Sequence, residues 1–401
     1  MQEVSSGLCY NKFRLLSERK KSDRIEMKLK FQNRVISMIR FSTGKIAVLL
    51  LVVALFLSAC QFKDATPSTG DETEEEIVFE QIPLPREEFR KIIGWKSEEE
   101  IIVQSGDIDG DSLYSFNIFT GSFSLLYETD SFILASNVIA SEEKIIVQQV
   151  KNAASTLIVL SYAGEQIQEL PINSNSFVDI NVNAQNPAVA FVSYYEGDNN
   201  TSVYNWNIET NEYTAVETAS LNPQWYSENL YLFIDNEDDF TLKTGKLYMG
   251  DIRNGEVLLL DSYASDFFLH EDTFIKFTPS DFNEQEIILT YQYPFLVDAG
   301  FMVAPKVTMN NRILFPYLTQ AERGTSIYGI FAEKAASIEE EPGQFVFAEL
   351  NFEEGQIEPI AEVPEAAPIL ISANGQYCLY GWNFELLIDI ENQTIHELIS
   401  L

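Results

Sequence analysis

Short apolar runs separated by turn residues make up most of the chain after residue 77. Runs such as Ile101–Val103 and Ile145–Val147 alternate with segments rich in Gly, Asn, Asp and Ser. This pattern is typical of many short β-strands, and the 3.6-residue period of an amphipathic helix is nearly absent. Only Ala332–Glu341, with its alanines and glutamate run, has the composition of a short helix or a disordered insert. The sequence therefore predicts an all-β fold.

Two sequence units recur along this region. Residues 97–104 reappear 44 residues later as residues 141–148, and residues 227–233 are a looser copy. A strand–turn–strand unit also recurs, with Gly or Asn where a hairpin needs positive φ. The first four of these turns lie at Gly121, Gly164, Asn211 and Gly255. Their spacings of 43, 47 and 44 residues match the length of a four-stranded β-propeller blade.

The same spacing gives a blade count. The turns at Gly255 and Gly355 are 100 residues apart, about two blades, and Leu296–Val303 is the candidate for the hairpin between them. Counting it predicts seven blades, whereas omitting it predicts six with one long insertion. Val78–Ile82 is expected to add a strand to the final blade and so to close the ring. The alternative fold, a β-sandwich with a second β domain, is disfavoured by the regular spacing.

A different pattern precedes the predicted propeller. The apolar run Ile46–Leu57 follows Arg40 and Lys45 and has twelve residues, too few to span a bilayer, which needs roughly 20 in a helix. A short apolar run after basic residues and before small ones is typical of a secretion signal. The run ends in Leu57, Ser58, Ala59 and Cys60, which together resemble the bacterial lipobox.

The lipobox resemblance implies that Cys60 receives a diacylglyceryl group and becomes the first residue after cleavage. Cys60 would then be a membrane anchor, because two acyl chains hold a protein on a bilayer far longer than one. The alternative is an uncleaved short membrane helix with an incidental cysteine. Cys9 lies upstream of the cut, which leaves Cys378 alone and no pair for a disulfide.

These patterns divide the chain into four parts. Residues 1–37 are a basic leader or a start-site artefact, because Met27 and Met38 are alternative starts to Met1. Residues 38–59 are the predicted signal peptide. Residues 60–77 are acidic and poor in apolar side chains, which predicts a disordered tether. Residues 78–401 are the predicted propeller.

The charge of the chain excludes one class of partner. Of 26 Lys and Arg and 61 Asp and Glu residues, 11 and 4 precede Cys60, so the remainder carries 15 and 57, a net charge of −42. Such a surface repels phosphates, and nucleic-acid binding is therefore not expected. A negative surface also keeps a protein soluble outside a cell and attracts divalent cations.

One acidic turn has calcium-ligand character. Asp107, Asp109 and Asp111 surround Gly110, and closely spaced carboxylates in such a turn are the hard oxygen ligands that calcium prefers. The glutamate that completes an EF-hand loop is missing, which favours an ordinary acidic hairpin turn over a calcium site. No other cofactor is predicted.

Motifs for catalysis are missing or incomplete. The chain has only two histidines, His270 and His396, which leaves little for a zinc site or a histidine-based triad. Carboxylate pairs for glycoside hydrolysis are uninformative, because 57 acidic residues make a close pair nearly certain. We therefore assign no catalytic residue.

The tryptophans offer a candidate binding face. Trp95, Trp225 and Trp382 are placed there as side chains that could contact sugars or peptides, and the alternative is that they fill gaps between blades. Gly94-Trp95 and Gly381-Trp382 form a similar pair in the first and last blades, near the expected closure. Cys378 is expected to be a buried core residue.

The combination of lipobox, acidic tether and repeated hairpins over residues 38–401 resembles the YqgU-like propeller lipoproteins of Gram-positive bacteria. The resemblance implies a six-bladed propeller on the outer face of the membrane and supplies no catalytic residues. The expected function is a lipid-anchored, non-catalytic module that binds an envelope protein or polymer. The alternative is an extracellular enzyme acting on glycans or peptides through carboxylates on the propeller face.

Overall fold

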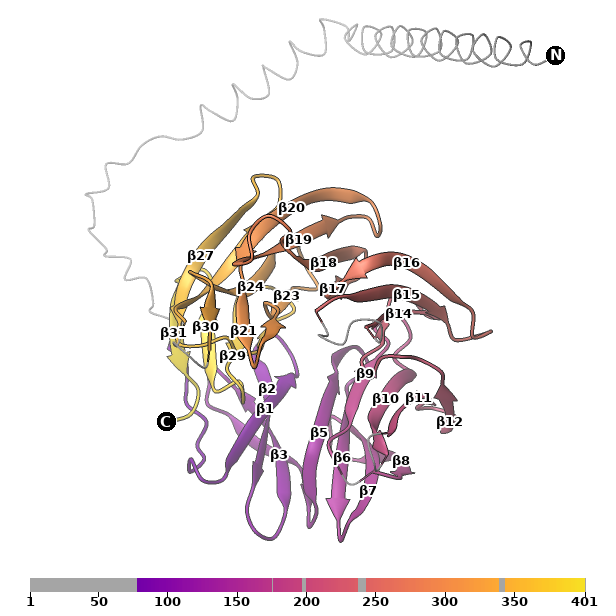
Figure 1. Ribbon diagram of the computed structural model, residues 1–401. Coiled ribbons are helices and arrows are strands. Elements are labelled where there is room, and N and C mark those ends of the chain that lie inside the picture. Colours follow the sequence, from indigo (N-terminus) through magenta and orange to yellow (C-terminus); the bar gives the residue numbers. More distant parts are fainter. Residues whose placement is uncertain (1–77, 175, 197–199, 237–242, 339–342, 401) are drawn as a thin grey trace, which may run out of the picture. The chain divides into compact units, whose positions relative to one another are not determined.

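The computed structural model describes residues 78–401 except 175, 197–199, 237–242, 339–342 and 401. The described residues form 31 strands and one 3-10 helix, η1 (Ala140–Glu142). Seven four-stranded antiparallel sheets follow one another around a common axis (Figure 1), so the predicted all-β propeller is confirmed. The predicted leader, signal peptide and tether lie outside the described residues. No helix in the described part of the chain is long and apolar enough to cross a membrane.

Each sheet is one blade, numbered here in chain order. Blade 1 contains β1 (Phe89–Trp95), β2 (Glu100–Gly106), β3 (Asp111–Asn117) and β4 (Phe123–Thr129). Blade 2 contains β5 (Phe132–Ile139), β6 (Lys144–Lys151), β7 (Ala154–Ser161) and β8 (Gln166–Ile172). Blade 3 contains β9 (Asp179–Val182), β10 (Val189–Glu196), β11 (Asn200–Asn207) and β12 (Glu212–Val216). Blade 4 contains β13 (Gln224–Trp225), β14 (Leu230–Asp235), β15 (Gly245–Asp251) and β16 (Val257–Ala264).

The last three blades have the same order. Blade 5 contains β17 (Asp266–His270), β18 (Thr273–Pro279), β19 (Glu286–Gln292) and β20 (Asp298–Pro305). Blade 6 contains β23 (Leu318–Gln320), β24 (Ile327–Ala332), β26 (Phe345–Asn351) and β27 (Gln356–Val363). Blade 7 contains β28 (Ile369–Ile371), β29 (Tyr377–Tyr380), β30 (Leu386–Asp389) and β31 (Thr394–Glu397). The predicted hairpin at Leu296–Val303 is the turn into β20, so the count of seven is confirmed and the six-blade alternative is wrong for this chain.

The order of strands gives the propeller two distinct ends. Within each blade, the connections between strands 1 and 2 and between strands 3 and 4 lie at one end, called here the turn end. The connections between strands 2 and 3 and between successive blades lie at the other, called here the loop end. Turn residues have positive φ at the predicted 3–4 hairpins, as that geometry requires. These residues are Gly121, Gly164, Asn211, Gly255, Gly355 and Gln393.

The hydrophobic core is divided among the contacts between blades. Seven buried clusters each join one blade to the next, including one that joins blade 7 back to blade 1. Strands in the middle of a blade are covered on both faces, which explains continuous apolar runs such as Ile101–Val103, whose side chains are buried completely. Trp206 fills the contact between blades 2 and 3.

The ring closes between blades 1 and 7 through side chains and single main-chain bonds. The Glu80 N–H donates to the Ile118 carbonyl in blade 1, at 2.8 Å, and the Ile82 N–H donates to the Leu398 carbonyl beside blade 7, at 2.7 Å. The predicted strand at Val78–Ile82 is therefore wrong. Its backbone bonds two different blades in turn, so it cannot run along the edge of either sheet, and blade 7 takes all four strands from residues 369–397.

A small three-stranded sheet lies outside the seven blades. It consists of β21 (Val307–Met309), β22 (Arg312–Leu314) and β25 (Ala336–Ser337), with β25 parallel to β21. The helix or disordered insert predicted for Ala332–Glu341 is therefore wrong as far as Ile338; the glutamate run lies outside the described residues. Backbone N–H groups of Ala336 and Ile338 donate to β21 and its flank, which holds this segment extended.

Candidate functional site

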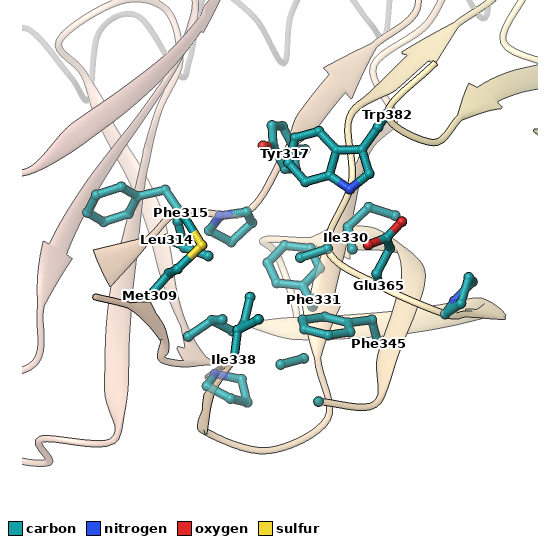
Figure 2. Close-up of a pocket in the computed structure, with 17 residues that line it drawn as sticks. Met309, Leu314, Phe315, Tyr317, Ile330, Phe331, Ile338, Phe345, Glu365 and Trp382 are labelled. Atoms are coloured by element: carbon teal, nitrogen blue, oxygen red, sulfur yellow. The ribbon is translucent and has the colours of Figure 1, made fainter. Parts of the chain in front are cut away.

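An apolar pocket lies at the loop end of blades 6 and 7. Its walls come from the β21–β22 hairpin, the loop that carries β25, the connection between blades 6 and 7, and the loop between β29 and β30 (Figure 2). The cavity measures about 430 Å³, which lies within the range of small-molecule and peptide-anchor sites.

The alternation of the β21–β22 hairpin directs its apolar side chains toward this pocket. Val307 and Leu314 are paired across the hairpin and both line the cavity, as does Met309 two residues on. Asn310 and Asn311 form the tight turn, and both have positive φ, which Asn tolerates better than most residues. Further lining side chains from blade 6 and its β25 loop are Ile330, Phe331, Ile338 and Phe345.

Two aromatic rings lie together in this lining. Trp382 and Tyr317 meet edge to face, with ring centroids 6.2 Å apart and planes at 89°. Trp382 is 57% exposed, an unusual position for so large an apolar side chain. Gly381 precedes it with φ of +114°, and a Cβ there would come within 2.6 Å of the Glu385 carboxylate. This position therefore requires glycine for the loop that carries Trp382.

Glu365 is the only charged residue among the 17 described residues that line the pocket. Its backbone is fixed by Tyr380, whose hydroxyl donates to the Glu365 carbonyl oxygen at 2.9 Å and lies 3.2 Å from the Glu365 N–H. Burial raises the pKa of Tyr380 to about 12, so its hydroxyl stays protonated and remains a donor. The Glu365 side chain lies on the Trp382 side of the pocket (Figure 2).

The structure does not bring the three predicted tryptophans together on one face. Trp95 is buried at the ring closure, where its indole N–H donates to the Leu370 carbonyl at 2.9 Å. Trp225 stacks on Phe191 between blades 3 and 4, at 3.9 Å between centroids. Only Trp382 lies at the apolar pocket. The two Gly-Trp pairs are therefore alike in sequence but lie in different environments.

Two of the predicted calcium ligands already have other hydrogen-bond partners. Asp107 caps its own turn, because its Oδ1 accepts the backbone N–H groups of Asp109 and Gly110 at 2.7 and 3.3 Å. Asp111 is buried and accepts the Ile133 N–H of blade 2 at 2.7 Å. Among the described residues, no group of three or more His, Cys, Asp or Glu side chains could hold a metal ion. Calcium binding at this turn stays a prediction.

A second cavity, of about 710 Å³, lies at the turn end and is lined by the first strands of five blades. It contains His270 and Glu322, and burial lowers the pKa of His270. Arg323 and Glu98 pair across it at 3.0 Å. His396 lies elsewhere, on the last strand of blade 7, so the two histidines do not share a site.

Of Cys378 and Cys60, the structure describes only Cys378. Cys378 is completely buried between blades 6 and 7, as expected for a core residue, and burial raises the pKa of its thiol. Cys60 and the rest of the predicted lipobox lie outside the described residues.

Sequence reasoning did not find the apolar pocket. Its lining comes from residues 305–382. The β21–β22 hairpin and the loop that carries β25 both lie in the 100 residues between Gly255 and Gly355, whose length alone predicts two blades. The available signal was local. Pro305, Pro316 and the Asn310-Asn311 pair interrupt the blade pattern between Gly255 and Gly355, which indicates an additional turn.

A family model and a relative of known sequence both match most of this chain. The family model described as "YqgU-like 6-bladed beta propeller domain" matches residues 117–381. The uncharacterized lipoprotein YqgU of Bacillus subtilis (strain 168) is 25% identical over 370 residues, which covers 88% of this chain and 97% of that protein.

Two solved structures show the same fold. The crystal structure of the uncharacterized protein lmo1340 from Listeria monocytogenes EGD-e matches with a TM-score of 0.73 and 18% identity, over 80% of this chain and 98% of that one. The tricorn protease matches with a TM-score of 0.50 and 8% identity, over 80% of this chain and 36% of that one. The family description counts six blades, whereas the described residues of this chain form seven.

Proposed function

Because the chain belongs to the family of YqgU-like β-propeller domains, we propose that it is a membrane-anchored extracytoplasmic lipoprotein whose propeller binds an envelope partner without catalysing a reaction. The lipoprotein part is supported by the lipobox at Leu57–Cys60 and by the name of the Bacillus subtilis relative. In this proposal the lipid on Cys60 holds the protein at the outer face of the cell membrane.

The observation that carries the binding role is the apolar pocket. Its lining is almost entirely aliphatic and aromatic, and its single carboxylate, Glu365, has no second acid or histidine among the described lining residues. Acid–base and nucleophilic sites usually combine a reacting side chain with a second polar group that activates or orients it. An apolar cavity with few polar groups is instead the usual form of a binding site.

The position of the pocket fits a protein tethered at its amino-terminal side. Phe79 packs on Phe119 and Tyr377, with ring centroids 5.5 Å from each. Phe119 lies in a connection at the turn end, so the chain joins the propeller there. The apolar pocket opens at the loop end, on the other side of the ring. A partner can therefore reach the pocket without crossing the point of attachment.

Replacement of Cys60 tests the anchor. Cys60→Ala removes the thiol that would carry the lipid, so the protein is expected to leave the membrane fraction when cells are fractionated. Cys378→Ala is the matched control, because it removes a buried thiol and leaves the lipobox intact. Retention of the Cys60→Ala protein on membranes would contradict lipid anchoring.

Filling the pocket tests the binding role. The neutral probe 4-phenylbutanol is expected to change the tryptophan fluorescence of the full chain reconstituted in lipid nanodiscs, because Trp382 lines the pocket. Ala366→Phe places a ring in the cavity and should abolish the change, whereas Ala215→Phe, on the exposed outer strand of blade 3, should preserve it. No response in the unmodified protein, or an equal response in both variants, would exclude the pocket as the binding site.

A further inference from the structure

Glu365 presents an unpaired carboxylate at the edge of an apolar cavity. The Glu365 side chain is exposed, and it makes no ion pair or hydrogen bond with another described residue. Its backbone is held on both sides by the Tyr380 hydroxyl, so the position of the side chain is fixed at its base. An exposed, unpaired carboxylate on a fixed stretch of backbone is available to a cation that enters from outside.

The two aromatic rings in the pocket lining favour the same kind of ligand. The faces of Trp and Tyr rings carry negative potential, and Trp attracts cations more strongly than the other aromatic side chains. Trp382 and Glu365 both line this cavity, and the close-up view shows them on the same side of it (Figure 2). A cation in this region would contact a carboxylate and an aromatic face, while an apolar group attached to it fills the cavity below.

The negative charge of the whole exported part also favours a cationic ligand. Residues after Cys60 carry a net charge of −42, and a field of this sign concentrates cationic ligands near the surface and speeds their association. Arg312 opposes this effect, because it pairs with Met309 across the β21–β22 hairpin and therefore lies on the pocket side of it. Arg312 does not line the cavity, but it would attract an acidic peptide. Tighter binding of the acidic peptide is therefore the competing outcome of the test below.

The strand order favours a peptide over a small amine. β22 is an end strand of the three-stranded sheet, so one of its edges has no neighbouring strand in the described part of the chain. Leu314 of β22 lines the pocket. An extended peptide can add its backbone to such an edge while one of its side chains enters the adjoining cavity.

We propose that the apolar pocket binds an extended basic peptide segment of a partner, with one large apolar side chain in the cavity and a neighbouring lysine or arginine beside Glu365 and Trp382. The proposal rests on the binding role given above and names the chemistry of the partner.

Three five-residue peptides with blocked ends separate the contributions of charge and apolar surface. Acetyl-Ala-Lys-Phe-Lys-Ala-amide carries both features, the Lys-Ala-Lys analogue lacks the ring, and the Glu-Phe-Glu analogue reverses the charge. Binding to the full chain in nanodiscs is followed by tryptophan fluorescence. The first peptide should bind at least tenfold more tightly than either of the others.

Two variants assign the effect to the pocket. Glu365→Gln should weaken binding of the lysine–phenylalanine peptide about tenfold and weaken binding of the neutral 4-phenylbutanol much less. Glu362→Gln is the matched control, because Glu362 is exposed on β27 and does not line the pocket. Equal binding of acidic and basic peptides, tighter binding of the acidic peptide, or no effect of Glu365→Gln would overturn the proposal.

A fourth ligand decides between a peptide and a small amine. 4-Phenylbutylamine carries a ring and a cation but has no peptide backbone to pair with β22, so it should bind more weakly than the peptide. Equal affinity would overturn the peptide assignment. The binding role itself fails only when 4-phenylbutanol also fails to bind, so the two failures are distinguishable.

Discussion

Removal of the Trp95 side chain should destabilise the propeller more than removal of Trp382, the tryptophan of the other Gly-Trp pair. Trp95 is 8% exposed and packs in the cluster that joins blade 1 to blade 7. Its indole N–H donates to the Leu370 carbonyl of blade 7 at 2.9 Å. Trp95→Ala therefore removes a large buried ring and one of the bonds between the first and last blades.

The size of the effect follows from these two losses. Truncating a buried Trp to Ala costs about 3 to 5 kcal/mol, because the lost contacts leave a cavity. Trp95→Phe retains most of the ring and loses chiefly the hydrogen bond, for about 1 to 2 kcal/mol. For a domain of this size, about 2 °C of melting temperature corresponds to each kcal/mol, so Trp95→Ala should lower it by about 6 to 10 °C.

Trp382→Ala is the natural control for this experiment. It removes the same side chain from the equivalent Gly-Trp pair, but Trp382 is 57% exposed and should cost less than about 1 kcal/mol. Urea and thermal unfolding of the full chain in a Cys60→Ala background measure all three variants. Equal losses for Trp95→Ala and Trp382→Ala would refute the assignment of Trp95 to the closure.

Three further predictions concern acidic residues. Asp111→Ala should lower the free energy of unfolding by about 2 to 3 kcal/mol in urea titrations, because it leaves a buried N–H unbonded between blades 1 and 2, whereas exposed Asp109→Ala should change it by less than about 0.5 kcal/mol. Burial raises the pKa of Asp266 to about 6, so the folded state binds a proton that the unfolded state releases, and stability should rise as pH falls from about 6 to 4. Asp266→Asn should therefore stabilise the protein by about 1 to 2 kcal/mol at pH 7 and show no such rise, and an unchanged pH profile would exclude Asp266 as its source. Because Asp107 already accepts two backbone N–H groups, calcium should leave the melting temperature unchanged, and an increase would support the predicted calcium turn.

The blades could be predicted from sequence because their signals are local and repeated. Ile101–Val103 is apolar without interruption since a middle strand is covered on both faces. Gly121 and Gly255 mark turns because their φ values, 67° and 70°, suit glycine. Each signal lies within about ten residues, and repetition at 43 to 47 residues confirmed it several times over. The prediction of a strand at Val78–Ile82 was wrong, and no repeated copy of this segment was present in the sequence to check it.

The site could not be predicted in the same way, because its parts are distant and do not repeat. Met309, Ile330 and Trp382 span more than 70 residues and meet only when blades 6 and 7 stand side by side. The local sequence does not predict the burial of a tryptophan. Trp95 and Trp382 both follow a glycine, yet Trp95 is buried and Trp382 is exposed. Whether an aromatic residue packs between blades or lies in a pocket depends on the loops around it.

The unequal lengths of the connections indicate where ligand specificity is encoded in this fold. Blades 4 and 5 are joined by Ser265 alone, whereas residues 306–317 join blades 5 and 6 and carry the β21–β22 hairpin. The contacts between blades are mainly apolar, and the same fold is found in the Listeria structure at 18% identity. The apolar pocket, in contrast, depends on one hairpin, one loop with β25 and the loop of Trp382. A relative with the same ring but a shorter connection between blades 5 and 6 should therefore lack the pocket, and a shared propeller does not imply a shared partner.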